Sequence, residues 1–337
     1  AESPSCWGLS CLRFCLGARR TMLPATRLAA MLLLAAAAAA THRAPPRSAA
    51  RLRPHASLQP APEQSGRVSA VTVATHADGY LDVLRASCTR GGVELTVLGF
   101  GQKWGGWAWR ASLLAAHLRE QPASAVVLVV DAFDVALLAD EPTIRERYAA
   151  FGAPIVFGCA EGARVDRPFL RAWYGSCRGE NLNAGGYMGP ASELLALTEV
   201  YLRDYADERD DQLAFTRICC ESGLFGEERV AIDTDGTLFY NAAHTLRPGT
   251  RLGLQLRDGR WTSARTGAQP CVLHAVGGGD MRHHLNAVGL DVSSIEVRNY
   301  ALHLLQNEPQ RAALFAVTAA GALVGAARLG VHLLGAP

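Results

Sequence analysis

The stretch Ser124-Ala-Val-Val-Leu-Val-Val-Asp-Ala-Phe-Asp134 decides the fold of this chain of 337 residues. Its Val/Leu run ends at Val130 and is too short for a stable isolated helix, so it predicts a strand that is covered on both faces. Ligands of open α/β sheets gather at the carboxyl ends of their strands. We therefore expect a binding site at Asp131 and Asp134, which follow directly.

Strand and helix patterns alternate on both sides of this run. Strands are expected at 68–75, 93–98 and 154–159, and helices at 81–88, 108–119 and 143–151. This alternation indicates an α/β domain with a mostly parallel central sheet. We expect the domain to span residues 67–290.

Both ends of the chain carry apolar runs. Residues 1–41 are expected to be an N-terminal extension with a signal, because arginines precede the apolar run 28–40. That run is shorter than the roughly 20 residues that span a bilayer, so a cleaved signal peptide is favoured over a signal anchor. An Ala-rich helix without a targeting role is the alternative. A signal here predicts the secretory pathway, in the ER or Golgi lumen.

Residues 42–66 are rich in Pro, Ala and Arg, which is typical of a linker. Residues 291–337 form a C-terminal segment with an uncharged apolar run at 312–327. A docked helix and a tail anchor both stay open for this run. Either terminal apolar run could anchor the protein to a membrane.

Composition excludes some partners. The formal net charge is +2 and the arginines are scattered, so nucleic acid is not an expected partner. None of the nine cysteines forms a C-x-x-C pair, which argues against a zinc site. Disulfides and buried thiols are both open for the six cysteines after residue 67.

The Asp131/Asp134 pair suits a hard divalent cation with oxygen ligands, and such a cation can bridge the phosphates of a nucleotide. Mg²⁺ and Mn²⁺ both fit. Acidic pairs after strands also cap helices, which is the alternative interpretation.

Six segments between Val68 and Gly279 occur in a characteristic order. They are Val73–Thr75 with Gly79–Leu81, Leu98–Trp104, Val130–Val135, Leu182–Gly189, Asp210–Thr216 and Leu273–Gly278. Together they resemble the glycosyltransferase domain of the procollagen lysyl hydroxylase and collagen galactosyl- and glucosyltransferase family (PLOD-like). The resemblance implies a GT-A type, Rossmann-like fold, a UDP-sugar donor, Mn²⁺ and retention of anomeric configuration.

The resemblance implies that Asp131, Asp134 and His274 bind the metal. Neutral imidazole is a competent Mn²⁺ ligand. His274 follows the apolar run 271–273, so a strand could deliver it to the same sheet edge. Without the resemblance, a satisfied structural histidine would be the default interpretation.

The donor side is also assigned by resemblance. Trp104 matches a donor-pocket Trp, Phe133 replaces a Tyr that stacks on uracil, and Arg110 aligns with a Lys that contacts the donor phosphates. Phe133 keeps the stacking face but loses the hydroxyl, and Arg keeps the charge without being equivalent to Lys. Simple core packing is the alternative for Trp104 and Phe133.

Further family positions frame the sugar. Asn183, Gly185 and Gly186 match a turn beside the donor sugar, with an ordinary loop as the alternative. Gly277 closes a segment near the diphosphate. Asp210 and Asp211 match an acidic pair required for transfer, which could position the sugar, stabilise charge at the anomeric carbon or take the acceptor proton. A solvated helix N-terminus is the other interpretation of this pair.

Three departures from the family restrain the expected activity. Val276 replaces an Asn near the diphosphate, and the segment Ala160–Asp166 lacks an acceptor-side Trp. Too little chain follows residue 290 for an iron hydroxylase domain, so lysyl hydroxylation is not expected.

The leading hypothesis is therefore transfer of a hexose, galactose or glucose, to a hydroxyl acceptor. Hydroxylysine of a collagen-like protein is the implied acceptor, and other proteins or glycans are open. A catalytically inactive lumenal module that binds nucleotide-sugars is the second hypothesis. A nucleotidyltransferase or sugar-nucleotide hydrolase is the third. The oligomeric state is not predicted.

Overall fold

The computed structural model describes residues 67–160, 174–177, 179–208, 210–220, 225–226, 228–242 and 253–295. The expected signal and linker, residues 1–66, lie outside these ranges, as does the apolar run 312–327. So does most of the Ala160–Asp166 segment. None of the described helices is long and apolar enough to cross a membrane.

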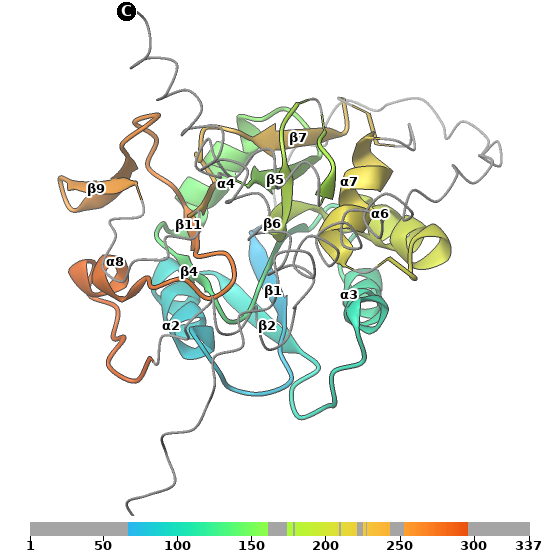
Figure 1. The fold of residues 1–337 in the computed structure, drawn as a ribbon, viewed down its shortest axis with the longest axis horizontal. Helices are drawn as coiled ribbons and strands as arrows, with labels where there is room; N and C mark the ends of the chain where they lie inside the picture. The colour runs from blue at the N-terminus through green and yellow to red at the C-terminus, as the bar shows by residue number, and fades with distance from the viewer. Residues whose placement is uncertain are drawn as a thin grey trace, which may run out of the picture.

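A six-stranded sheet forms the centre of the domain (Figure 1). Its order is β2 (Glu94–Leu98), β1 (Ser69–Val73), β3 (Val126–Val130), β6 (Leu182–Pro190), β5 (Ile155–Cys159) and β7 (Val230–Asp233). The pairs β1–β2, β1–β3 and β5–β7 are parallel, and β6 is antiparallel to β3 and β5. Every strand except β6 therefore points the same way, which confirms the expected mostly parallel sheet.

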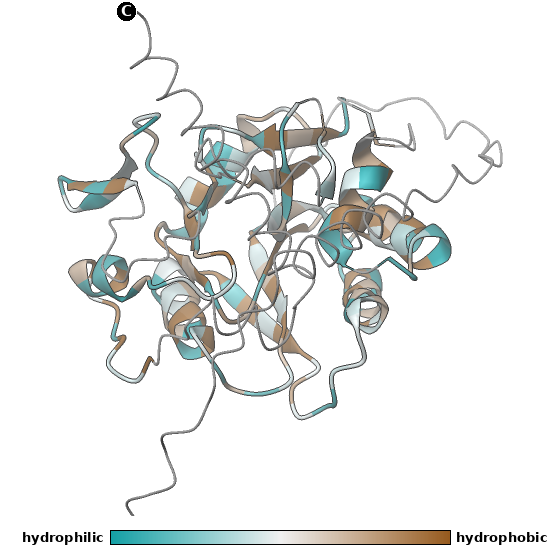
Figure 2. Cartoon of the chain, in the orientation of Figure 1, coloured by the Kyte–Doolittle hydropathy of each residue, from teal (hydrophilic) through white to brown (hydrophobic). Residues whose placement is uncertain are grey.

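Helices cover both faces of this sheet. On one face lie α3 (Trp107–Glu120), α6 (Ala191–Asp204) and α7 (Asp211–Cys220), and on the other lie α2 (Leu81–Gly91) and α4 (Glu141–Ala149) (Figure 1). Figure 2 shows the apolar strands between the mixed surfaces of the helices.

The residues of β3 explain why its sequence is apolar throughout. Val127 and Val129 pack in the core under α3 and α6, whereas Val126, Leu128 and Val130 pack in the core under α2 and α4. All five residues are buried. Burial of each such side chain contributes on the order of 1.5–3 kcal/mol, so a polar residue on either face would be costly.

The expected elements before residue 160 are confirmed, with ends that shift by at most three residues. The expectation for Asn183–Gly186 is wrong, because these residues lie inside β6 instead of a turn. Glycine has low strand propensity, which conceals the strand in the sequence. On the β3 side, Gly186 pairs with Val130 and the carbonyl of Gly185 accepts from the N–H of Asp131, whereas the pairing with β5 passes directly from Tyr187 to Asn183.

A second, smaller sheet lies beside the first. It consists of β4 (Val135–Leu137), β11 (Val272–His274) and β8 (Phe239–Asn241), with β11 in the middle. The chain passes from β3 to β4 through Asp131–Asp134, so these carboxylates stand where the two sheets meet.

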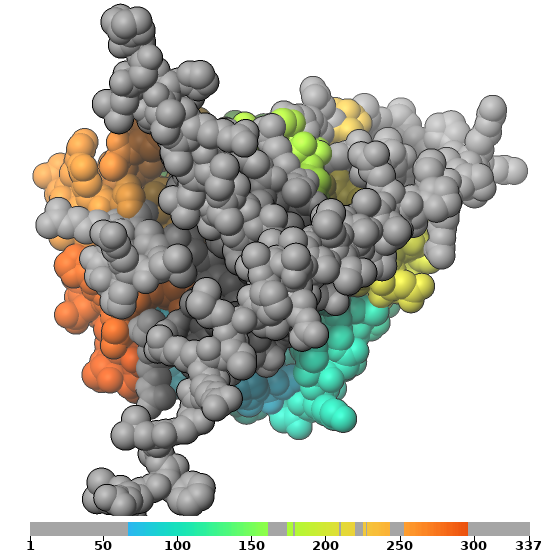
Figure 3. Space-filling view, viewed as in Figure 1, coloured from blue at the N-terminus to red at the C-terminus, as the bar shows by residue number. Residues whose placement is uncertain are grey.

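The periphery of the small sheet carries a hairpin and a short helix. The hairpin is β9 (Leu254–Arg257) and β10 (Arg260–Ser263), and the helix is α8 (Arg282–Ala287). Figure 3 shows this part in orange on one side of the molecule, with α3 and α6 on the other. Trp261 anchors the hairpin, because its indole Nε1 donates to the carbonyl of His284 at 2.8 Å.

The cysteines divide between the two expectations. Cys177 is disulfide-bonded. Cys88 and Cys271 are buried free thiols, and burial raises the pKa of Cys88 to about 12 and that of Cys271 to about 11. These thiols contribute to packing and are too weakly acidic to act as nucleophiles near neutral pH.

Candidate active site

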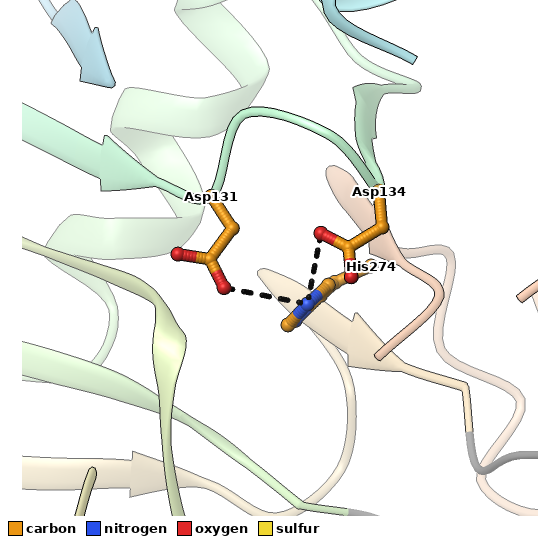
Figure 4. A group of neighbouring side chains, drawn as sticks. All are labelled: Asp131, Asp134 and His274. Carbon is orange, nitrogen blue, oxygen red and sulfur yellow. Dashed lines mark ion pairs between the residues drawn. The ribbon is translucent and has the colours of Figure 1, made fainter. Parts of the chain in front are cut away.

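Asp131, Asp134 and His274 converge where the two sheets meet, and we call them the metal cluster (Figure 4). His274 Nε2 lies 3.4 Å from Asp134 Oδ1 and 3.8 Å from Asp131 Oδ2. One ligand atom from each residue lies within 4.8 Å of the others. The structure thus brings together the three residues that the resemblance implied as ligands.

Backbone contacts hold the two aspartates of the metal cluster in place. Asp131 follows β3, and its N–H donates to the carbonyl of Gly185 in β6 at 3.0 Å. Asp134 Oδ2 accepts from the N–H groups of Gly277 at 2.9 Å and Gly278 at 3.2 Å. These bonds leave Asp134 Oδ1 directed at His274.

A strand delivers His274, as expected, but that strand belongs to the small sheet. His274 is the last residue of β11 and pairs with Val135 of β4. Because Val135 directly follows Asp134, this pairing brings the imidazole next to that carboxylate. The site therefore depends on the contact between two sheets, not on the edge of one.

Gly185 leaves the space that the imidazole occupies. A Cβ atom at this position would lie 2.1 Å from His274 Cε1 and 2.7 Å from Asp131 Oδ2. A Cβ at Gly186 would lie 2.7 Å from Phe239 Cδ1. The Gly-Gly sequence of β6 is thus explained by close packing against the metal cluster and the small sheet.

Asn241, which sequence reasoning missed, contacts the inner side of His274. Its Oδ1 lies 2.8 Å from His274 Nδ1, and its Nδ2 donates to the carbonyl of Cys159 at 2.8 Å. No motif in Phe239-Tyr-Asn241 marks this residue. Its position follows from the parallel pairing of β8 with β11.

Arg110, expected to contact donor phosphates, joins two carboxylates in the structure. Its guanidinium is buried, bonds Asp131 Oδ1 at 2.9 Å through Nη2 and forms a short ion pair with Asp211 through Nη1. Burial alone would lower the pKa of Arg110, but the two carboxylates raise it on balance. The guanidinium is therefore a fixed positive charge beside the metal cluster.

The neighbouring carboxylates Asp210 and Asp211 have different environments. Asp210 Oδ1 accepts from the N–H of Leu213 at 2.8 Å, so Asp210 caps α7. This agrees, for Asp210, with the interpretation of the pair as a helix N-terminus. Asp211 is 7% exposed and points inward to Arg110. Burial raises the pKa of Asp211 to about 7, although Arg110 lowers it.

The pKa values of all three residues of the metal cluster are shifted from their ordinary values. Desolvation and the charge of Asp134 raise the pKa of Asp131, against the effect of Arg110. Burial would raise the pKa of Asp134, but His274 and the glycine N–H groups lower it on balance. Burial would likewise lower the pKa of His274, but the two carboxylates raise it. Cooperating shifts of this kind are typical of functional sites.

Asn183 lies in β6, and its side chain reaches the start of α7. Its Oδ1 accepts from the N–H of Gly185 at 3.0 Å, and its Nδ2 donates to Gln212 Oε1 at 3.2 Å. The residue is 3% exposed. Asn183 thus links the Gly-Gly segment to the helix that carries Asp211.

An exposed group of Phe100, Trp104 and Trp107, which we call the aromatic edge, lies between β2 and α3. Trp104 is 46% exposed, so it is not a core residue. Its ring makes edge contacts with Trp107 and Trp109, at centroid distances of 5.3 and 5.5 Å. Trp107 lies 5.8 Å from the guanidinium carbon of Arg110, which connects this edge to the metal cluster.

Phe133 packs partly against the core, and its role toward uracil stays a prediction. It is half-buried against the core under α2, and its ring lies 5.4 Å from the exposed ring of His76. Its backbone carbonyl accepts from the N–H of Tyr80 at 3.0 Å. Gly79 is required beside it, because a Cβ there would lie 2.4 Å from that carbonyl oxygen.

The donor set of the metal cluster fits a divalent cation of the Mn²⁺ or Mg²⁺ kind. Two carboxylates and a neutral imidazole provide hard oxygen ligands and one nitrogen. The charge of Asp134 adds to desolvation in raising the pKa of Asp131, and a cation there would relieve that repulsion.

Comparison with known proteins identifies the family of the domain. The family model described as the PLOD GT domain matches residues 64–296. The chain is 26% identical over 239 residues to a procollagen-lysine,2-oxoglutarate 5-dioxygenase of Drosophila melanogaster, covering 66% of this chain and 32% of that protein. It is 26% identical over 235 residues to a multifunctional procollagen lysine hydroxylase and glycosyltransferase of Caenorhabditis elegans, covering 65% of this chain and 31% of that protein.

The chain spans about a third of the length of these relatives. Among solved structures, a glycosyltransferase involved in the glycosylation of the major capsid of PBCV-1 has a TM-score of 0.39 at 9% identity, covering 65% of this chain and 98% of that one. That score is too low to support an inference. The family match extends over the whole described region, and the observed α/β architecture agrees with the GT-A type fold that the resemblance implied. The chain therefore belongs to the PLOD glycosyltransferase domain family.

Proposed function

We propose that this protein transfers a hexose, galactose or glucose, from a UDP-sugar to a hydroxyl group, with a divalent cation held by Asp131, Asp134 and His274. The observation that carries the proposal is the convergence of these three side chains from the β3–β4 segment and from β11. The two carboxylates are neighbours in one short segment, but His274 is distant in the sequence and reaches them only through the fold. A metal-dependent transferase accounts for their convergence.

A bound cation would neutralise charge on the donor diphosphate and favour departure of UDP. Mn²⁺ is proposed because the site includes an imidazole, and Mg²⁺ is the alternative. Gly277 and Gly278 lie in the turn after His274 and have positive φ angles of 74° and 82°. The turn therefore places the backbone of these two glycines beside the metal cluster, where a diphosphate would lie.

The remaining donor contacts are proposed from the residues around the metal cluster. The exposed face of Trp104 and the partly exposed ring of Phe133 offer stacking surfaces for uracil. Arg110 holds Asp131 in place and supplies positive charge beside the diphosphate. Asn183, Gly185 and Gly186 line the sugar side.

In the transfer, the acceptor hydroxyl oxygen forms a bond to the anomeric carbon while the bond from that carbon to the diphosphate oxygen breaks. The hydroxyl proton passes to a carboxylate or to the departing diphosphate, and UDP leaves. Asp211, with a pKa of about 7, is suited to accept a proton near neutral pH. Asp210 would orient the sugar from the N-terminus of α7. Retention of configuration is proposed from the family alone.

The proposed domain boundaries are 67–290 for the transferase, with a signal or anchor at 1–41, a linker at 42–66 and a tail at 291–337. The relatives modify procollagen by name. We therefore propose work in the ER or Golgi lumen on a hydroxyl acceptor such as hydroxylysine of a collagen-like protein.

The decisive experiment incubates purified protein with UDP-galactose, UDP-glucose and related donors, with and without a hydroxylysine-containing peptide. UDP release and peptide mass are measured. We expect transfer from one hexose donor with Mn²⁺, loss of transfer with chelator and recovery when Mn²⁺ is restored. Asp131→Asn protein should be inactive under all conditions, and undiminished transfer by that variant would refute the metal assignment.

A second candidate function, a binding module without turnover, is favoured by one observation. The Asp211 carboxylate is buried and engaged by Arg110, so it does not face the open side of the site in this state. Calorimetry with UDP and Mn²⁺ followed by the transfer assay separates the two functions. Tight UDP binding without any turnover would support the module, and Asp211→Asn protein would then bind UDP as wild type does.

A further inference from the structure

Asn241 occupies a buried position between the two sheets. It is the last residue of β8, lies opposite His274 in the parallel pairing of β8 with β11, and is 1% exposed. Its side chain bridges from the small sheet to β5 of the central sheet, through the carbonyl of Cys159. A buried amide in such a place must satisfy its donors and its acceptor.

The chemistry of its partners fixes the orientation of the amide. The carbonyl of Cys159 can only accept, so the Asn241 NH₂ group must face it, at 2.8 Å. Asn241 Oδ1 then faces His274 Nδ1, also at 2.8 Å. An amide oxygen can only accept, so His274 Nδ1 carries the proton. The lone pair of the neutral ring is left on Nε2, which faces Asp131 and Asp134.

The surrounding backbone makes room for this arrangement. A Cβ at Gly158 would lie 2.5 Å from Asn241 Nδ2, so a side chain there would displace the amide. The pairing of β5 with β6 is irregular between Phe157 and Gly158, next to the same point. Close approach of β5 to Asn241 is therefore a feature of the fold.

We propose that Asn241 is a positioning residue that holds His274 in its Nδ1–H tautomer and directs Nε2 toward a divalent cation. The inference rests on the proposed function, because the cation is what Nε2 would bind. Partners of this kind orient metal-bound histidines and raise their basicity. Nothing in the family segments quoted above includes Asn241.

The wild-type protein provides the first test. Long-range ¹H–¹⁵N spectra of histidine-labelled, metal-free protein report which ring nitrogen is protonated, at an alkaline pH where the imidazole is neutral. The His274→Gln variant assigns the signals. We expect the Nδ1–H tautomer, and an Nε2–H tautomer in wild-type protein overturns the inference without any Asn241 variant.

Two variants provide the second test. Asn241→Leu keeps similar volume but removes the acceptor, so Mn²⁺ affinity should fall by about 10–100-fold and the tautomer preference should be lost. Asn241→Asp keeps an acceptor toward His274, so it should keep the tautomer and bind Mn²⁺ more tightly than Asn241→Leu. The exposed Asn286→Leu on α8 is the matched control and should bind as wild type does.

The outcomes separate this inference from the proposed function. If wild-type protein binds Mn²⁺ and Asn241→Leu binds it equally well, the inference alone is overturned. If the wild type has the Nδ1–H tautomer but binds neither Mn²⁺ nor Mg²⁺, the proposed function falls, and the metal role of Asn241 falls with it. Equal loss of affinity in both variants with an unchanged tautomer would assign Asn241 a packing role and overturn the inference.

Discussion

The metal cluster and the aromatic edge lie on either side of Arg110 and are held in opposite ways. In the cluster, backbone N–H groups, Asn241 and Arg110 each fix a particular oxygen or nitrogen. At the edge, Phe100 is 51% exposed and lies against the Arg85 guanidinium, and Trp104 is 46% exposed and lies against the rings of Trp107 and Trp109. Because of this difference, we expect substitutions in the cluster to lower both the free energy of unfolding and the affinity for ligands. Substitutions at the edge should lower the affinity for ligands alone.

Asp134→Asn should have the largest effect. It removes a ligand of the cation and presents an amide to the N–H groups of Gly277 and Gly278, which need an acceptor. We expect Mn²⁺ affinity to fall by more than about 100-fold. We also expect the free energy of unfolding to fall by about 1–3 kcal/mol, because the charge-assisted bonds from the two glycine N–H groups and the ion pair with buried His274 are weakened.

Isothermal titration with Mn²⁺ and chemical unfolding measure these two quantities. Asp82→Asn is the matched control, because the Asp82 side chain is 75% exposed on α2 and forms its ion pair with Arg85 of the same helix. If Asp134→Asn protein bound Mn²⁺ as the control does, the metal cluster would not be the Mn²⁺ site and its contrast with the aromatic edge would fail.

Gly185→Ala should have the next largest effect. The new methyl group would overlap His274 Cε1, so the ring must shift away from the carboxylates. We expect a loss of about 1–3 kcal/mol in the free energy of unfolding from overpacking. Mn²⁺ affinity should fall by about 10-fold or more, as for displaced ligands elsewhere.

Gly152→Ala separates the two consequences. Gly152 has φ of 65° and nothing within 4 Å of an added Cβ. Its substitution should cost about 1–2 kcal/mol through the backbone alone. Unchanged Mn²⁺ affinity in this variant beside a reduced affinity in Gly185→Ala would show that ring displacement, not lower stability, weakens the site.

The fold could be predicted from the sequence because the strands before residue 160 consist largely of apolar residues, which marks them as buried. β3 is apolar on both faces, and the acidic residues after it mark the site. β6 was not predicted as a strand, since the Gly-Gly segment that approaches His274 closely is a poor strand former. At this segment its extended state comes from the β3 side, because the pairing with β5 skips the two glycines.

The environment of the site was less predictable than its ligands. Arg110 meets Asp131 and Asp211 across separations of 21 and 101 residues, and Asn241 meets His274 across 33. Such contacts are set by sheet pairing and helix packing, which local patterns do not encode. Asp210 and Asp211 were treated alike in the sequence, but the start of α7 turns one toward its own backbone and the other inward.

Trp104→Ala tests the aromatic edge. If its exposed ring stacks on uracil, UDP affinity should fall by the ~1–3 kcal/mol typical of stacking between a base and an aromatic ring. The free energy of unfolding and Mn²⁺ affinity without nucleotide should change little, because the ring is largely outside the core. Trp104→Phe should restore part of the UDP affinity.

Phe100→Ala is the control from the same edge, with Arg85 as its cationic neighbour at 5.4 Å. We expect its UDP affinity, measured by calorimetry, to match wild type. Equal UDP affinity in Trp104→Ala and Phe100→Ala would remove Trp104 from the donor site. A loss of Mn²⁺ affinity in Trp104→Ala would show that the edge and the cluster are not independent.

Trp107→Leu should have the smallest effect and examines the contact between the two regions. The ring lies against the Arg110 guanidinium, which bonds the metal ligand Asp131. Leucine keeps apolar volume but removes the cation–π attraction, worth about 0.5–1 kcal/mol at such a site. Because Asp131 and Asp211 still hold Arg110 from the other side, Mn²⁺ affinity should fall by no more than about 2–5-fold. A loss as large as that of Asp134→Asn would mean that Trp107 sets the position of Arg110, and the edge and the cluster would then have to be treated as one cooperative unit.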